Sequence, residues 1–487
     1  MRAARVGCTR AAMLKLLALL GALGAGLLSA GASQAAAPTY VRTPCIGDFS
    51  ASAFKVECGT LTVDETRGSP HSRRVAMPVA VVKAAAPKPG LPPVIYLHGG
   101  PGGGSVEGLE RRLRGRMASE LLAQDQDWIF FDQRGGTLSA PSLDCGHAAL
   151  NDAGPISEGD LHALQACGAR WAASGVDLSR YNAKEVALDV QDLRRALGLK
   201  TFDIYGGSYG TRIGFAVITH APQGLRAAVL DSVWPPEAKW AEGGPQLISD
   251  AAKTLFARCR SDTACNAKYP EAAAKLDALA RRLLSAPLVV GRRTYTPEDL
   301  GGFLMDQIYL NIGAKSLPRD VYAFDRGDFS ALDAQIAERS PYTEGQHLTH
   351  LCKEEFPFER RAGVAEGTAD DPVARLSVRS FERYFDVCRA WPVGAADPVE
   401  QRPVSSPIPT LFLSAEIDPG CPPPLAEAAA RRFANGRFVM IPNTTHGVVG
   451  QSTCARRMVR DFLRDPSKAP DTSCLHPEHD RFAFVTD

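Results

Sequence analysis

The sequence predicts an α/β fold, in which a mostly parallel sheet is flanked by helices and carries a largely helical cap insertion. Two observations lead to this prediction. Short apolar runs that are typical of buried strands alternate with segments of helical spacing up to about residue 235. Helical stretches then dominate to about residue 405, and the alternation of strands and loops returns after them.

The expected elements follow the chain in this order. Strands are predicted at Arg74–Lys83, Pro93–Leu97, Trp128–Phe131, Phe202–Tyr205, Ala227–Leu230, Thr410–Leu413 and Phe438–Ile441. Helices are predicted at Glu185–Leu199, Thr211–Thr219, Ser249–Arg260, Ala272–Ser285 and Asp320–Glu338. We therefore divide the chain into a signal peptide (1–37), a first core part (38–235), the cap (236–405) and a second core part (406–487).

The first 37 residues have the pattern of a secretory signal peptide. Arg2, Arg5, Arg10 and Lys15 precede the uncharged run Leu16–Leu28, and small residues follow it. The rival interpretation is a membrane anchor, but the run is shorter than the roughly 20 apolar residues that cross a bilayer. We expect a secreted or periplasmic protein with no stable membrane anchor after cleavage.

Charge and cysteine content limit the possible partners and cofactors. The chain has 55 Lys and Arg against 54 Asp and Glu, without the basic excess of a nucleic-acid-binding protein. Of its 12 cysteines, Cys8 lies in the signal peptide. An exported chain of this kind is expected to hold disulfides. The near-neighbour candidates are Cys45–Cys58, Cys145–Cys167 and Cys259–Cys265, and one thiol stays unpaired. No Cys-x-x-Cys occurs, which weakens a zinc or thioredoxin-like interpretation. No cofactor is implied. The oligomeric state is left open.

A candidate nucleophile lies between a predicted strand and a predicted helix. Gly206-Gly207-Ser208-Tyr209-Gly210 matches G-x-S-x-G, a sharp turn in which small residues surround a serine raised above the sheet. The same five residues in another context would be a glycine-rich turn with an inert serine. The position after a strand and before a helix favours Ser208 as a nucleophile.

A glycine-rich segment, His98–Gly104, follows an earlier strand. Acyl transfer needs backbone N–H donors close to the developing oxyanion, and glycines allow that approach. We predict the N–H groups of Gly100 and Tyr209 as the donors, and interpret His98 as structural. The segment does not fit a phosphate-binding loop, which would end in Gly-Lys-Ser/Thr or read G-x-G-x-x-G.

A serine nucleophile also needs a base and an acid that orients it, and the expected chain order is serine, acid, histidine. Asp418 follows a late strand and His446 follows the next, so we assign Asp418 as the acid and His446 as the base. Glu416 and Asp231 are the rival acids, and Asp231 is more simply interpreted as a structural or capping residue.

The remaining motifs are given non-catalytic interpretations. The pairs His347/His350 and His476/His479 have a spacing that suits a metal, but no supporting carboxylate motif accompanies them, so we predict surface histidines. The basic cluster around Arg112 is predicted to be the solvated face of a helix.

With these residues identified, the chain resembles the α/β-hydrolase superfamily, and within it the secreted tripeptidyl aminopeptidases and prolyl aminopeptidase-like serine peptidases. The resemblance rests on His98-Gly99-Gly100-Pro101-Gly102, Asp132-Gln133-Arg134-Gly135, Gly206-Gly207-Ser208-Tyr209-Gly210-Thr211, Leu230-Asp231-Ser232-Val233, Asp418-Pro419 and His446-Gly447. Cys58-Gly59-Thr60-Leu61-Thr62-Val63 and Cys352-Lys353-Glu354-Glu355 also resemble that group. This resemblance implies the α/β-hydrolase fold and a serine peptidase with a Ser-Asp-His triad.

The chain departs from the family pattern in two loops. Gly136-Thr137 reverses the usual Thr-Gly after Asp-Gln-Arg-Gly, and Gly420-Cys421-Pro422 replaces the common Val-Thr-Pro after Asp-Pro. A Cys421–Cys454 disulfide could hold the acid loop to the segment after His446, with Cys474 as the alternative partner of either cysteine.

The resemblance implies peptide substrates whose free N-terminal ammonium is bound by a carboxylate of the cap. Glu354 and Glu355 are the candidates, and the alternative is a pair of acids on an exposed helix end. We therefore expect an exported serine aminopeptidase that acts through an acyl-enzyme. The alternatives are an esterase or amidase with the same triad, and a catalytically inactive binding protein on a hydrolase scaffold.

Overall fold

The computed structural model describes residues 37–50, 52–146, 154–337, 342–475 and 482–486. The predicted signal peptide, apart from Ala37, lies outside these residues, and so do His476 and His479. None of the helices in the described part of the chain is both long and apolar enough to cross a membrane.

Within the described residues, nine strands form one mixed sheet in the order β1-β2-β3-β5-β4-β6-β7-β10-β11. The strands are β1 (Thr39–Arg42), β2 (Val56–Asp64), β3 (Arg74–Val82), β4 (Val94–Leu97), β5 (Trp128–Phe131), β6 (Phe202–Gly207), β7 (Leu225–Asp231), β10 (Thr410–Ala415) and β11 (Gly436–Ile441). The first three and β5 pair in antiparallel fashion, whereas β5, β4, β6, β7, β10 and β11 are parallel. The predicted mostly parallel sheet is confirmed.

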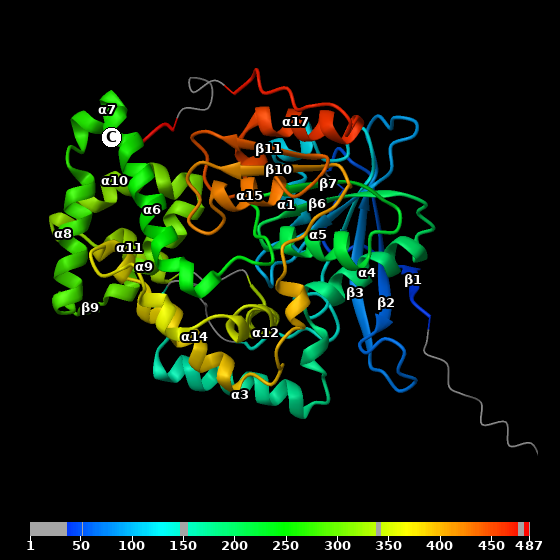
Figure 1. The fold of residues 1–487 in the computed structure, drawn as a ribbon, viewed down its shortest axis with the longest axis horizontal. Coiled ribbons are helices and arrows are strands. Elements are labelled where there is room, and N and C mark those ends of the chain that lie inside the picture. The colour runs from blue at the N-terminus through cyan, green and yellow to red at the C-terminus, as the bar shows by residue number, and fades with distance from the viewer. Residues whose placement is uncertain (1–36, 51, 147–153, 338–341, 476–481, 487) are drawn as a thin grey trace, which may run out of the picture.

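Helices cover both faces of this sheet (Figure 1). The helices of the core are α1 (Leu109–Arg112), α2 (Arg116–Glu120), α3 (Glu158–Ala173), α4 (Ala183–Ala196), α5 (Tyr209–His220), α15 (Pro423–Ala430), α16 (Val448–Gln451) and α17 (Thr453–Arg464). Because side chains alternate along a strand, Ile95 and Leu97 pack into the hydrophobic core on the α4 and α5 side. Val94 and Tyr96 of the same strand pack into the core on the α2 and α17 side.

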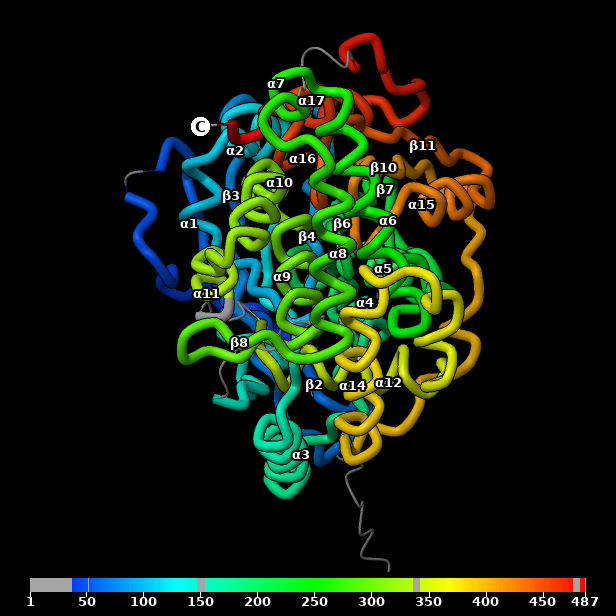
Figure 2. The backbone as a smooth tube through the Cα atoms, turned by 90° about the vertical axis from the view of Figure 1, so that its left-hand side faces the viewer, coloured from blue at the N-terminus to red at the C-terminus, as the bar shows by residue number. Residues whose placement is uncertain are grey.

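The segment between β7 and β10 builds a layer of helices beside the sheet, and Figure 2 looks onto this layer. It contains α6 (Trp240–Ser261), α7 (Thr263–Lys268), α8 (Ala272–Ser285), α9 (Pro297–Tyr309), α10 (Asn311–Asp325), α11 (Ser330–Ala337), α12 (Glu344–Glu354), α13 (Pro372–Arg375), α14 (Val378–Ala390) and the hairpin β8 (Leu288–Val290) and β9 (Arg293–Tyr295). Helix α3, which precedes α4 in the chain, also packs against α14. We call the layer formed by α6 to α14 and the β8–β9 hairpin the cap.

The prediction of one continuous helix at Asp320–Glu338 is wrong, because the helix is interrupted between α10 and α11. Gly327 adopts a φ of +85°, which only glycine tolerates well, and ends α10. The N–H of Gly327 donates to Phe324 O at 2.9 Å and that of Asp328 to Ala323 O at 3.0 Å. This is the Schellman arrangement of a helix C-terminus.

Five disulfides join described cysteines, and three of them are the predicted near-neighbour pairs Cys45–Cys58, Cys145–Cys167 and Cys259–Cys265. The others are Cys352–Cys388, which joins α12 to α14, and Cys454–Cys474. The suggested Cys421–Cys454 pair is wrong, because Cys454 pairs with Cys474, the alternative partner named above, and Cys421 is a buried free thiol.

The C-terminal segment returns from the core to the cap. Its last described residues cross to α10, where the Val485 N–H donates to Lys315 O at 3.0 Å. Phe482 is buried at this contact, 5% exposed, below the Lys315 ammonium. The end of the second core part therefore contacts the cap, and the sequence did not indicate this contact.

Candidate active site

The candidate nucleophile sits in a strained turn between β6 and α5. Ser208 has φ 58° and ψ −131°, a conformation that is costly for any residue with a side chain. The turn needs its glycines, since a Cβ on Gly206 would lie 2.4 Å from Gly210 O, and one on Gly210 would lie 2.1 Å from Leu97 O. Such a turn raises the serine hydroxyl at the edge of the sheet, as the motif predicts.

The candidate acid and base meet in the structure. Asp418 follows β10, His446 follows β11, and His446 Nδ1 lies 2.9 Å from Asp418 Oδ2 and 3.0 Å from Oδ1. The backbone N–H groups of Gly420 and Cys421 donate to Oδ1 at 3.0 and 2.8 Å. Burial acts to raise the pKa of Asp418, but His446 and these hydrogen bonds together lower it below its usual range. The carboxylate therefore stays ionised and fixes the Nδ1–H tautomer of His446.

The rival acids have other partners. Asp231, at the end of β7, accepts the Tyr205 hydroxyl at 2.7 Å and caps α16 through the N–H groups of Val448 and Val449, each at 3.1 Å. Glu416 pairs with Arg258 and accepts the Asn443 N–H at 2.9 Å. Neither of these carboxylates has a hydrogen bond to His446 within the described residues.

Asp231 and Ser232 tie the base loop to the nucleophile turn. The backbone N–H of Ser208 donates to Asp231 O at 2.9 Å, while the Asp231 carboxylate holds the start of α16 directly after His446. The Ser232 hydroxyl accepts the Gly447 N–H at 2.9 Å. Among the described residues the Ser208 hydroxyl makes no hydrogen bond, and catalytic hydrogen bonds often shorten only when substrate is bound.

The glycine-rich segment after β4 packs directly on the nucleophile turn. A Cβ on Gly99 would lie 2.7 Å from both Gly207 O and Ser208 Cβ, so the next residue, Gly100, lies beside the turn. Gly100 has φ +118°, which favours glycine. Tyr209 is the first residue of α5, where backbone N–H groups lack partners within the helix. The predicted oxyanion donors thus lie on the two segments that flank Ser208.

His98 is a neutral residue inside this loop. Its Nδ1 lies 3.0 Å from Gly99 O, and Arg112 donates to its Nε2 at 2.5 Å. Burial and the Arg112 charge lower the pKa of His98 to about 4. Arg112 is partly buried against His98 and the Tyr96 hydroxyl, so the prediction of a wholly solvated arginine cluster is wrong at this residue.

Helix α12 of the cap contacts both segments that would supply oxyanion donors. The Thr343 N–H donates to Gly102 O at 2.9 Å, and His347 Nδ1 lies 3.0 Å from Pro101 O. His350 Nδ1 lies 2.6 Å from the Tyr209 hydroxyl. The prediction of surface histidines is wrong here, because His347 and His350 are 1% and 0% exposed. Burial lowers the pKa of His350 to about 3, so it is a neutral hydrogen-bonding residue.

The acidic pair at the end of α12 is also buried, which overturns the alternative of an exposed helix end. Glu354 contacts Arg212 Nε at 3.3 Å, accepts the Ala183 N–H at 2.6 Å and accepts the Tyr209 hydroxyl. Arg212 Nη1 lies 2.8 Å from Glu355 Oε1. The sequence analysis did not predict the roles of Arg212 and of the Tyr209 side chain. An arginine inside the mostly apolar helix α5 is the signal that could have indicated this cluster.

The environment of Glu355 is unusual for a carboxylate. Its Oε1 receives Arg212 and the Trp234 indole N–H, the latter at 3.3 Å, while Oε2 has no hydrogen bond within the described residues. Burial raises the pKa of Glu355 to about 8 even though Arg212 acts to lower it. An approaching cation would therefore find a carboxylate oxygen that the protein leaves available.

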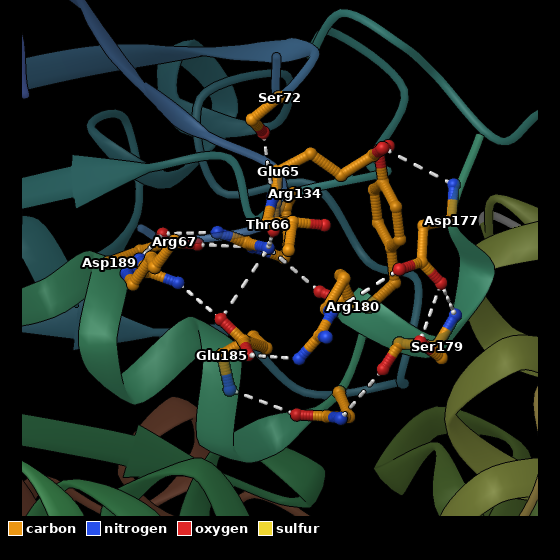
Figure 3. A network of polar contacts seen from close by, with 12 residues as sticks. Glu65, Thr66, Arg67, Ser72, Arg134, Asp177, Ser179, Arg180, Glu185 and Asp189 are labelled. Carbon is orange, nitrogen blue, oxygen red and sulfur yellow. Dashed lines mark hydrogen bonds and ion pairs between the residues drawn. The ribbon is translucent and has the colours of Figure 1, made fainter. Parts of the chain in front are cut away.

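The Asp-Gln-Arg-Gly motif after β5 has a structural role, shown in Figure 3. Arg134 is fully buried and forms a two-pronged ion pair with Asp189 of α4, with both nitrogen–oxygen distances 2.7 Å. Its Nη1 donates to Arg180 O at 2.8 Å and Glu65 O at 3.1 Å, and Arg67 also contacts Asp189. Arg134 therefore fixes the loop after β5 to the core. Gln133 of the motif donates to His98 O at 2.9 Å, and among the described residues the motif has no hydrogen bond to Ser208.

Comparisons with known proteins find relatives among hydrolases and serine peptidases. Residues 377–474 match a family model described as TAP-like protein. A tripeptidyl aminopeptidase of Streptomyces lividans is 25% identical over 86% of this chain and 83% of its own length. The serine protease Hip1 of Mycobacterium bovis is 26% identical, with coverage of 83% and 84%. The putative hydrolase YuaR of Escherichia coli is 24% identical over 78% of this chain and 79% of its length.

These matches and the fold support the placement of the chain in the α/β-hydrolase superfamily. The same matches support its assignment as a serine peptidase of that superfamily. Among solved structures, the proline iminopeptidase of Mycobacterium smegmatis aligns with 81% of this hydrolase and 96% of its own chain, at 16% identity and a TM-score of 0.41.

Proposed function

We propose that this hydrolase is an exported serine peptidase that removes residues or short peptides from the N-termini of peptides. In this proposal Ser208 attacks the scissile carbonyl, His446 accepts the serine proton and returns it to the leaving amine, and Asp418 holds His446 in the required tautomer. The N–H groups of Gly100 and Tyr209 bind the oxyanion. The observation that carries the catalytic part is the contact of 2.9 Å between His446 Nδ1 and Asp418.

Recognition of the peptide N-terminus is proposed to fall to the acidic pair of α12. Glu354 contacts the side chain of Tyr209, the residue after the nucleophile, and both carboxylates contact Arg212. The oxygens of Glu354 are already used by Tyr209, Arg212 and the Ala183 N–H. Glu355 Oε2 is therefore the better partner for an ammonium group, and Glu354 positions it.

Export is proposed from two features. The predicted signal peptide begins the chain, and the five described disulfides are typical of proteins that fold in an oxidising compartment. A secreted or periplasmic destination is the proposal, and cell fractionation with N-terminal sequencing of the mature protein tests it.

The decisive experiment for the function is a substrate panel on purified mature protein. The panel compares aminoacyl and tripeptidyl nitroanilides, with free and blocked N-termini, against short-chain nitrophenyl esters, with Ser208→Ala as the control. We expect turnover of nitroanilides with free N-termini. Turnover of esters alone would favour the esterase or amidase, and a failure of Ser208 to react with a fluorophosphonate would favour an inactive binding protein.

The role of the acidic pair has its own test. Glu355→Gln replaces a carboxyl that can ionise beside a bound ammonium with an amide that cannot, and should raise KM for free peptides by about 10- to 100-fold, since hydrogen bonds to charged groups contribute about 1.5–3 kcal/mol. Turnover of an N-blocked ester should survive. Glu366→Gln is the matched control, because that side chain is exposed and pairs with Arg360. An unchanged KM in both Glu354→Gln and Glu355→Gln would refute the assignment.

A further inference from the structure

Cys421 is a free thiol beside the candidate acid and base. It is 4% exposed, follows Asp418 by three residues and donates its backbone N–H to Asp418 Oδ1. One ligand atom each from Asp418, Cys421 and His446 lies within 4.8 Å of the other two. The ten other described cysteines are all paired, and the unpaired thiol lies beside a histidine and a carboxylate.

The three groups form a ligand set that suits a thiophilic divalent cation. Thiolate, imidazole and carboxylate are the ligands of Zn²⁺, with metal–ligand distances of about 2.0–2.3 Å. In a tetrahedral site such ligands lie roughly 3.5 Å apart, so the three atoms need to move inward by only about 1 Å. Asp418 Oδ1 is held by two backbone N–H groups, but Oδ2 is bonded to His446 alone among the described residues.

We propose that Asp418, Cys421 and His446 form an inhibitory site for a thiophilic divalent cation such as Zn²⁺ or Cd²⁺. The cation binds Asp418 Oδ2, the Cys421 sulfur and His446 Nδ1, and water completes its coordination. The thiol releases one proton to solvent, and the proton on His446 Nδ1 moves to Nε2. No redox step or further reactant is needed.

Occupation of this site would stop catalysis through the tautomer of the base. With a proton on Nε2, the imidazole has no lone pair to accept the Ser208 proton, and its link to Asp418 runs through the metal. The cation reaches the site past the His446 side chain, which is 13% exposed. Hard cations such as Mg²⁺ and Ca²⁺ prefer oxygen ligands and should have no effect at the same concentration.

Metal binding is tested without substrate. Cd²⁺ is titrated into the metal-free full-length mature protein, and the ultraviolet thiolate-to-cadmium charge-transfer band is recorded. We expect saturation at one Cd²⁺ per chain in the native protein and in Ser208→Ala, and loss of the band in Cys421→Ala and Cys421→Ser. A band that persists in both Cys421 variants, or no band at 100-fold molar excess, overturns the proposal whether or not the peptidase function holds.

Inhibition is tested separately with any substrate that the protein turns over. The inhibition constant for Zn²⁺ is measured for each variant relative to its own uninhibited rate, with recovery by EDTA as the check for reversibility. We expect at least a tenfold weaker inhibition in Cys421→Ala and Cys421→Ser. The control variant His220→Ala removes a histidine at the far end of α5, and Zn²⁺ should inhibit it with the same inhibition constant as the native protein. Equal inhibition in the native protein and both Cys421 variants overturns the inhibitory role.

Discussion

Asp231 accepts the backbone N–H of Ser208 at 2.9 Å while its side chain caps the helix that follows His446. One residue at the end of β7 thus holds the candidate nucleophile turn and the candidate base loop together. The carboxylate is fully buried, and burial raises its pKa although three hydrogen bonds and His446 act to lower it. The arrangement explains how two loops 238 residues apart meet at one edge of the sheet.

Asp231→Asn should therefore impair positioning without removing a reacting group. The amide NH₂ cannot accept the Val448 or Val449 N–H, so one donor of the α16 cap loses its partner. We expect a destabilisation of about 1–3 kcal/mol and a lower kcat with little change in KM. Chemical denaturation and steady-state kinetics measure the two effects. A variant with native stability and native kcat would show that this contact does not position the base.

Asp418→Asn should lower kcat by about 10⁴-fold, because an asparagine no longer fixes the Nδ1–H tautomer of His446. Glu416→Gln is the matched control two residues earlier, and its contacts to Arg258 and Asn443 do not reach His446. Its kcat should stay within a few-fold of the native value. If the two variants lost activity equally, Asp418 would not be the acid.

The stability of the protein should depend on pH through Glu355. Its folded pKa of about 8 lies above the ordinary 4.5, so the folded state holds a proton that the unfolded state releases between these values. Unfolding thus becomes easier as pH rises from about 5 to 8, by on the order of 1–3 kcal/mol. Glu355→Gln should flatten this slope in urea denaturation series. A slope that is identical in the variant would contradict the buried, protonated carboxyl.

The Cys352–Cys388 disulfide should support activity as well as stability. It joins α12, which contacts Tyr209, to α14. Replacing both cysteines by alanine should lower the unfolding free energy by about 2–4 kcal/mol and reduce kcat, because α12 contacts the two segments that carry the proposed oxyanion donors. The Cys45→Ala/Cys58→Ala double variant, whose disulfide joins β2 to the segment after β1, is the control and should lose stability alone. Equal kcat in the two double variants would show that the Cys352–Cys388 disulfide does not support activity.

The sequence predicted the elements whose signals are local. The strands β4, β5, β6, β7 and β10 are short apolar runs followed by glycine or acidic turns, and the nucleophile turn needs glycines because Leu97 and Gly210 leave no space for a Cβ. The sequence could not predict burial of His347 and His350, because the residues that they contact, Pro101 and Tyr209, lie more than 100 residues away in the chain. The partner of Cys454 likewise depends on the path of the C-terminal segment.

The most direct test of the proposed triad is a crystal structure of the protein after reaction with a fluorophosphonate. We predict a covalent bond from Ser208 Oγ to phosphorus, His446 Nε2 within about 3.2 Å of Oγ, and a phosphoryl oxygen within about 3.1 Å of the Gly100 and Tyr209 N–H groups. An adduct on another residue, or His446 turned away from a modified Ser208, would contradict the account.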